Sequence, residues 1–126
     1  QFSYNSNPPT SGPHFASPAN WGVYDYEVHD KLFIHNLEHG DIWIAYHPRI
    51  SEEAKKQLQK FEFSKIVTSP REANETDIAL VAWERVDKFN LDDGAFPETH
   101  VRDFIKRYRS KGPEKIPAGA MESTFN

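Results

Sequence analysis

The strongest chemical feature of the sequence is a pair of histidines, His35 and His39, in the six-residue segment HNLEHG at positions 35–40. Side chains four residues apart lie on one side of an α-helix, and an even separation also places them on one face of a β-strand. In either conformation both imidazoles can reach one ion. On a helical turn Glu38 borders the same site, as a hydrogen-bond acceptor or a base. The spacing therefore indicates a metal site.

Two further residues could complete this site. His14 follows Gly12-Pro13 within a proline-rich loop, so a stiff turn would present its imidazole. Met121 is the only methionine, and it follows a stretch of small residues outside every predicted core element. Imidazole binds Cu(II) well, and a thioether adds affinity for Cu(I). The expected copper ligands are His14, His35, His39 and Met121, with Glu38 orienting an imidazole N–H from outside the coordination sphere.

Zinc is the alternative metal. Three histidines and a water form a catalytic zinc arrangement, and Glu38 could act as the base on that water. Met121 distinguishes the two metals, because a thioether in the fourth position would close the site to hydrolysis. The remaining histidines, at positions 29, 47 and 100, are single residues without a partner in the spacing, so they are expected to be structural.

Composition excludes several other kinds of chemistry. The chain has 126 residues and no cysteine, which excludes disulfides, a thiolate nucleophile, a zinc ribbon and an iron–sulfur centre. Its formal net charge of −4 lacks the positive footprint of a nucleic-acid-binding protein. Nine Phe, five Tyr and three Trp residues supply the large side chains of a core. The length and composition predict one folded domain over residues 1–126.

The elements that position the site follow from periodicity and from helix and turn signals. The apolar run at 42–46 predicts a buried strand that stops at Pro48, and further strands are predicted at 66–68 and 78–86. Ser51, followed by two glutamates and an apolar stripe, begins one helix. A second helix begins at Pro97 and ends near Gly112. Residues 90–94 form a turn.

These elements predict a single α+β domain with a small mixed sheet, two helices and a long, ordered, proline-rich N-terminal loop. Residues 1–40 are expected to be the ordered loop region that carries the histidine motifs, because its prolines are interleaved with aromatic side chains that a flexible linker would not need. Residues 41–112 contain the sheet and the helices, and 113–126 form a tail.

Three segments resemble the signatures of an uncharacterised bacterial family, domain of unknown function thirty-one-oh-five. They are PPTSGPH at 8–14, WGVYD at 21–25 and HNLEHG at 35–40. The resemblance extends over most of the chain and implies a domain outside the cytoplasm, periplasmic or on the cell surface, that follows an N-terminal membrane anchor preceding Gln1. It implies no activity, but its signatures carry His14, His35 and His39.

A second, shorter resemblance concerns five residues. His35, Glu38 and His39 match the H-x-x-E-H pattern of inverzincin metallopeptidases. In that family the pattern lies within a long helix and a downstream acid completes the zinc site. Here Gly40 and a β-rich run follow at once, which leaves room for little helix.

Three functions follow as expectations. The first is an extracytoplasmic copper-binding domain that delivers, stores or sequesters copper and is not an enzyme, with a metal-donor or metal-acceptor protein as its partner. The second is a zinc-dependent hydrolase that uses Glu38 as base. The third is a protein-interaction module whose histidines are structural and whose aromatic loop, with Trp21 and Tyr24, faces a partner. We expect no nucleic acid, and contact with a membrane only through a segment preceding Gln1.

Overall fold

A five-stranded mixed sheet with helices on both faces organises the structure. The computed structural model describes residues 5–13, 17–92 and 95–113. The strands are β1 (Gly22–Val23), β2 (Ile42–Tyr46), β3 (Ile66–Pro70), β4 (Ile78–Ala82) and β5 (Arg85–Phe89), and their order across the sheet is β1-β3-β2-β4-β5. β3 runs parallel to β1 and β2, whereas β4 is antiparallel to β2 and β5. The helices of the described residues are α1 (Asp30–Glu38), α2 (Glu52–Gln59) and α3 (Glu98–Tyr108).

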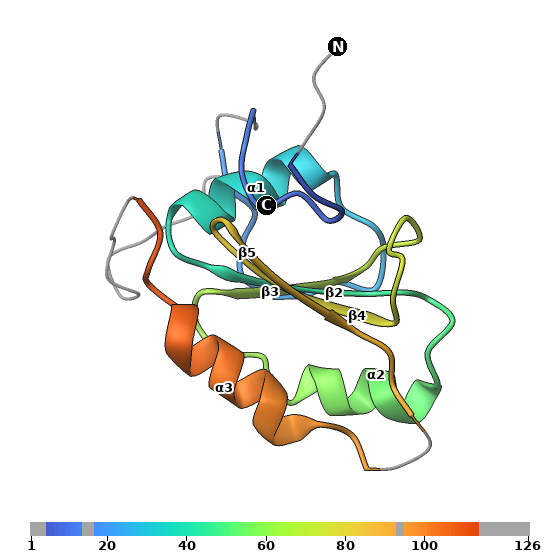
Figure 1. Ribbon diagram of the computed structural model, residues 1–126. Helices are drawn as coiled ribbons and strands as arrows, with labels where there is room; N and C mark the ends of the chain where they lie inside the picture. The colour runs from blue at the N-terminus through green and yellow to red at the C-terminus, as the bar shows by residue number, and fades with distance from the viewer. Residues whose placement is uncertain (1–4, 14–16, 93–94, 114–126) are drawn as a thin grey trace.

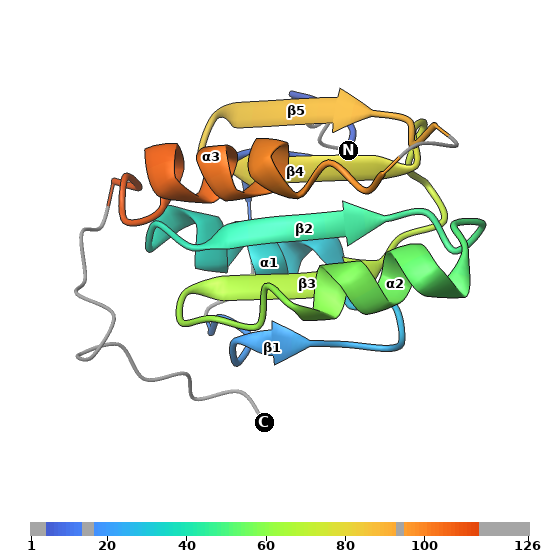
Figure 2. The same cartoon turned by 90° about the horizontal axis from the view of Figure 1, so that it is seen from below.

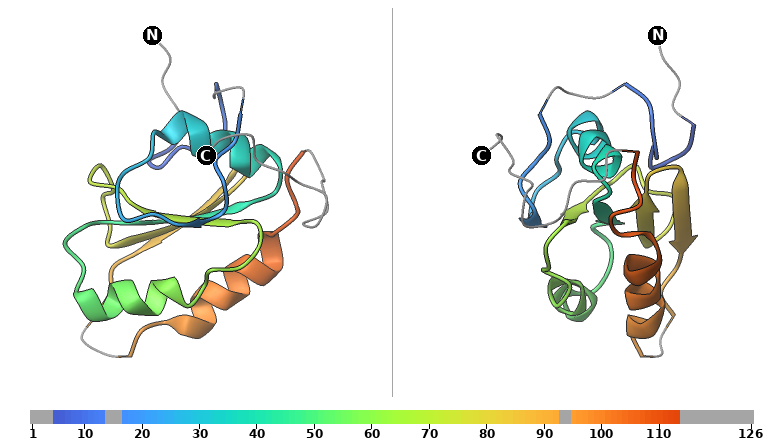
Figure 3. Two further views of the ribbon diagram at one scale, coloured as in Figure 1. Left: turned by 180° about the vertical axis from the view of Figure 1, so that it is seen from behind. Right: turned by 90° about the vertical axis from the view of Figure 1, so that its left-hand side faces the viewer.

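The strand side chains divide the core into two layers. Alternate residues of a strand point to opposite faces of the sheet, so Ile42 and Ile44 of β2 pack with α2 and α3, whereas Trp43 and Ala45 pack with α1. Figures 1 and 2 show α2 and α3 together on one face of the sheet and α1 on the other, and the side view in Figure 3 shows the same three layers. Both faces are covered, which explains why every residue of β2 is buried.

Local sequence signals begin the two helices that the sequence predicts. The hydroxyl of Ser51 accepts a hydrogen bond from the backbone N–H of Ala54 and caps α2, and two glutamates in the first turn complement the helix dipole. Pro97 directly precedes the first helical residue of α3. The α+β class and the mixed sheet are therefore confirmed.

Two features differ from the sequence-based expectation. Residues 1–40 were expected to be loop, but they contain strand β1 and a third helix, α1, which buries four apolar side chains against the sheet. The segment 78–86, expected as one strand, is a hairpin in which β4 and β5 are joined by Trp83 and Glu84. Glu84 adopts a left-handed conformation with φ of 59° and turns the chain without the glycine or asparagine that usually marks such a turn.

The described part of the N-terminal loop is ordered, as expected. The Asn7 side-chain amide donates to the Ala73 carbonyl at 2.8 Å, and the Thr10 carbonyl accepts from the Glu84 backbone N–H at 3.1 Å. These bonds hold the loop against the connection after β3 and against the β4–β5 turn.

The chain that follows α3 packs directly on the end of α1. The Ser110 backbone N–H donates to the Gly40 carbonyl at 2.7 Å. A Cβ on Gly112 would lie 2.6 Å from the Glu38 carbonyl oxygen and 2.5 Å from the Gly40 nitrogen, which is closer than real side chains permit. Only glycine therefore allows this contact, and it brings the start of the C-terminal segment to the turn that carries Glu38 and His39.

Replacement of Gly112 tests this contact. We expect Gly112→Ala to lower the free energy of unfolding by about 1–3 kcal/mol, the usual cost of forcing extra atoms into a packed interior. Urea denaturation followed by circular dichroism measures the change. Lys111→Ala, at an exposed neighbouring position, is the control and should unfold as the wild type does. Equal stability of Gly112→Ala and the wild type would show that the two segments are not in contact.

Candidate metal centre

The histidine pair lies on the last turns of α1, so the structure selects the helical conformation of the two that the spacing allows. His39 is the C-terminal cap of the helix, and its backbone N–H bonds to the carbonyls of His35 and Asn36. Gly40 follows with φ of 87°, the left-handed conformation that ends helices, and its N–H bonds to the Leu37 carbonyl at 2.9 Å. The helix therefore stops immediately after the second histidine.

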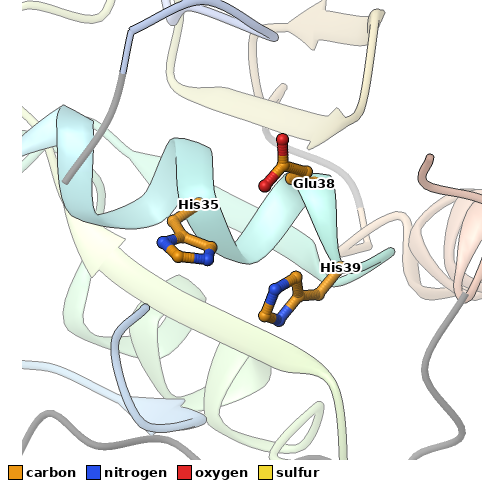
Figure 4. A group of neighbouring side chains, drawn as sticks. All are labelled: His35, Glu38 and His39. Carbon is orange, nitrogen blue, oxygen red and sulfur yellow. The ribbon is translucent and has the colours of Figure 1, made fainter. Parts of the chain in front are cut away.

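One donor atom each from His35, Glu38 and His39 lies within 4.8 Å of the others. The two imidazole centroids are 4.7 Å apart with the rings at 84° (Figure 4). The side chains of His35 and Glu38 are half-buried, and Nδ1 of His39 is buried. Partly desolvated donors this close together could share one first-row metal ion after a change of rotamer. Glu38 stands among these donors, so its carboxylate could bind the metal directly.

A buried hydrogen-bond network fixes the helix that carries these donors. The Asn36 side chain pairs with the backbone of Ala19, accepting from its N–H at 2.8 Å and donating to its carbonyl at 2.9 Å. The same amide nitrogen donates to Oδ2 of Asp41 at 2.8 Å, and so does the indole N–H of Trp21. Asn36 and Asp41 thereby connect α1, the following turn and the N-terminal segment through fully buried groups.

Burial raises the pKa of the Asp41 carboxyl to about 6, against the opposing effects of the hydrogen bonds from Asn36 and Trp21 and of the nearby Lys65 and His35. Oδ1 of Asp41 is also buried and has no hydrogen-bond partner among the described residues. The ionised form is therefore poorly solvated, and Asp41 takes up a proton well above its ordinary pKa.

Lys65, the residue before β3, contacts the end of the same helix. Its ammonium donates to the carbonyl of His39 at 2.8 Å, and burial lowers its pKa. A cation at the C-terminal end of a helix complements the helix dipole. Lys65 adopts a left-handed conformation with φ of 63°, and its own carbonyl accepts from the Ile42 N–H, so it connects α1 to the start of β2.

Three of the five residues predicted for the site can be placed. His35, Glu38 and His39 come together, whereas His14 and Met121 lie outside the described residues. Both are close in sequence to described residues. Pro13 directly precedes His14, and Gly112, which contacts the Glu38 carbonyl, lies nine positions before Met121.

The other three histidines lie outside the cluster, and each has a hydrogen-bond partner. His29 accepts from the Lys31 N–H and caps the start of α1, and His47 accepts from the Arg49 N–H. His100 pairs with Asp87 at 2.6 Å.

Sequence reasoning did not find the residues that hold the site in place. Asn36 lies within the histidine motif and Asp41 directly follows it, but nothing in their spacing indicates that they share a hydrogen bond. One signal was available in the sequence: Asn36 is a polar residue close to the apolar run Leu32–Ile34 and next to Leu37. In the structure it is fully buried together with them. Lys65 gave no signal and Gly112 indicated only the end of the last helix, because their contacts with the end of α1 join segments that are far apart in the sequence.

The fold and the site define a small α+β domain with a candidate metal centre at the C-terminal end of helix α1. The chain belongs to the family described as protein of unknown function, DUF3105, which matches residues 1–120. Comparisons with curated proteins and with solved structures gave no match. Among the described residues, no helix has the length and apolar character needed to cross a membrane.

The stability of the protein should report the Asp41 environment. The folded-state pKa is raised from 3.8 to about 6, so the folded protein binds the extra proton and is stabilised below about pH 4. This contribution is lost as the pH rises through about 6 and amounts to about 3 kcal/mol at most. In metal-free buffer, the stability of the wild type relative to Asp41→Asn should therefore fall between pH 4 and pH 7.5. Urea unfolding of both proteins measures this, and a constant difference would contradict the assignment.

Proposed function

We propose that this domain binds a copper ion through His35 and His39, completed by His14 and Met121, and that it delivers, stores or sequesters copper without catalysing a reaction. The observation that carries the proposal is the cluster of His35, Glu38 and His39, whose donor atoms lie within 4.8 Å of one another. Imidazole nitrogens suit copper in both oxidation states, and a thioether would favour Cu(I).

Chain geometry supports the contribution of His14 and Met121. Met121 is nine residues from Gly112, which contacts the Glu38 carbonyl, and an extended chain of ~3.3–3.6 Å per residue reaches about 30 Å over that length. On the N-terminal side, the bonds between Ala19 and Asn36 hold the segment after His14 against α1 itself. His14 and Met121 thus both belong to segments in which described residues, Ala19 and Gly112, contact α1.

The proposed location is outside the cytoplasm, in the periplasm or at the cell surface, with a membrane anchor preceding Gln1. A chain without cysteine suits this environment, since it has no thiolate ligand that oxidation could remove. A tethered copper-binding domain would exchange its ion with a metal-donor or metal-acceptor protein.

Copper titration of ligand variants tests the proposal. We expect the wild type to bind one copper ion per chain, and His35→Ala and His39→Ala each to weaken binding by at least about 100-fold, since even residues that only orient a ligand contribute 10–100-fold. Competition with a chromophoric chelator measures the affinity for Cu(II) and, under reducing conditions, for Cu(I). Met121→Leu should weaken Cu(I) binding more than Cu(II) binding.

His47→Gln is the matched control. His47 is not one of the clustered donors, and its Nδ1 accepts a hydrogen bond from the Arg49 backbone N–H. It should bind copper as the wild type does. Unchanged stoichiometry and affinity in both His35→Ala and His39→Ala would refute the copper site.

Zinc-dependent hydrolysis is the second candidate, and the position of Glu38 favours it. The carboxylate stands within reach of both imidazoles, where it could bind zinc or activate a zinc-bound water. Under this alternative, Glu38→Gln should retain zinc by elemental analysis but lose hydrolysis of ester, peptide or phosphate substrates in a general screen. Absence of hydrolysis by the zinc-loaded wild type would eliminate the candidate.

A further inference from the structure

A hollow beside α3 combines aromatic and positively charged side chains. It lies between α3 and residues 61–63, in the segment that joins α2 to β3. Figures 1 and 2 show this segment and α3 on the same side of the sheet. The volume of the hollow is about 500 Å³, and small-molecule sites measure about 300–1,000 Å³. The hollow is therefore large enough for a small ligand.

One wall of the hollow is aromatic. Phe61 and Phe63 line it, and Ile105 of α3 adds to this apolar lining. Phe61 and Ile105 belong to the core layer between the sheet and the helices, whereas 44% of Phe63 is exposed. Among the described residues, the other large apolar side chain with such exposure is Tyr26. The phenyl ring of Phe63 is thus available to pack against a ligand.

The other wall is positively charged. Arg102, Lys106 and Arg109 line the hollow, and its described lining contains no carboxylate. The Arg102 guanidinium pairs with Glu98 at 2.9 Å and lies 5.1 Å from the centroid of the Phe61 ring. Lys106 and Arg109 form no ion pair with the part of the chain that the structure describes. Two positive charges are therefore unbalanced at the hollow.

The helix dipole explains only part of this arrangement, because it favours cations on every side of the C-terminal end of α3. On the opposite flank of α3, Arg107 lines a hollow in which the carboxylates of Asp87 and Asp103 stand beside the cations. The flank with the aromatic wall lacks such carboxylates. There Nη1 of Arg109 donates to the Ser64 carbonyl at 3.4 Å, which holds the guanidinium beside the aromatic segment.

The two walls together define the chemistry of a ligand. A phosphate monoester carries a charge of about −1.5 to −2 at pH 7, which matches the two unbalanced cations. Lysine and arginine both bind phosphate oxygens, arginine through parallel N–H groups. An aromatic ring attached to the phosphate can pack against Phe63 from within the hollow. Because the walls come from different segments, a ligand between them contacts both.

We infer that this hollow binds a small phosphate monoester with an aromatic or other apolar body, its phosphate at Lys106 and Arg109 and its body against Phe63. The cations supply electrostatic attraction, and the phenyl ring selects for an apolar group. A free ester is favoured over the phosphate of a lipid headgroup, because a flat bilayer surface can touch an exposed ring but does not fill a hollow between two segments. The inference is independent of the metal site.

The probe is phenyl phosphate, titrated into the ¹⁵N-labelled chain. We expect saturable shifts of the amide resonances of Phe63, Lys106 and Arg109. Inorganic phosphate lacks the ring and benzyl alcohol lacks the charge, so each should bind at least about tenfold more weakly than phenyl phosphate.

Charge variants test the positive wall. K106Q/R109Q should weaken the binding of phenyl phosphate at least about tenfold, and added salt should weaken binding to the wild type, because the attraction is electrostatic. The matched control R85Q/R107Q removes two cations from the opposite flank of α3 and should bind as the wild type does.

Phe63→Ala tests the aromatic wall at an exposed position, where the fold does not depend on the ring. It should weaken the binding of phenyl phosphate at least about threefold and leave the binding of inorganic phosphate unchanged. Tyr26→Ala removes the other exposed large side chain and is the matched control, with unchanged binding of both probes.

Three results would overturn the inference. The first is an absence of saturable shifts at millimolar phenyl phosphate. The second is equal loss of binding in R85Q/R107Q and K106Q/R109Q, which would make the attraction a property of the whole helix end. The third is that vesicles containing phosphatidylglycerol, and not phenyl phosphate, bind in a manner that depends on Lys106 and Arg109, which would make this surface a membrane contact.

Discussion

The buried amide of Asn36 and the carboxyl of Asp41 are the groups on which the arrangement around α1 depends. They are polar, fully buried and hydrogen-bonded to three parts of the chain: the N-terminal segment at Ala19, the indole of Trp21 and the turn after the helix. Groups of this kind are costly to bury unless their partners are in place, so they permit essentially one packing. That packing orients the last turns of a helix of only nine residues, which would be marginal in isolation.

The candidate site lies at the end of a helix, and its residues are of two kinds: those that offer donor atoms and those that hold the backbone in place. His35, Glu38 and His39 each offer a nitrogen or oxygen atom within 4.8 Å of the others, while Asn36, Gly40 and Lys65 hold the backbone that carries them. The supports act through main-chain contacts, so they can tolerate changes at the donors.

The parts of the fold that could be predicted from the sequence are those with local causes. β2, α2, β3 and α3 each have a capping residue, a proline boundary or a clear apolar pattern, and each forms where the pattern indicates. The β4–β5 hairpin was missed, because Glu84 takes a left-handed conformation that its residue type does not indicate. Helix α1 was missed, because residues 1–40 were expected to be loop and the stability of this short helix comes from contacts with Ala19 and with the sheet. The histidine pair needed only spacing, whereas the supports of the site required contacts that join distant segments.

The backbone contact between Gly112 and the end of α1 determines when the site can be complete during synthesis. The donor pair leaves the ribosome early, but the chain that packs against its helix end comes seventy-two positions after Gly40. Contacts of such long sequence separation form late, because they must close a large loop. A growing chain therefore carries its histidines in a helix end that is still uncovered, and the surroundings of the donors become complete only when nearly the whole domain has been synthesised. If the cluster binds the proposed ion, this order of assembly separates the synthesis of the protein from the loading of that ion.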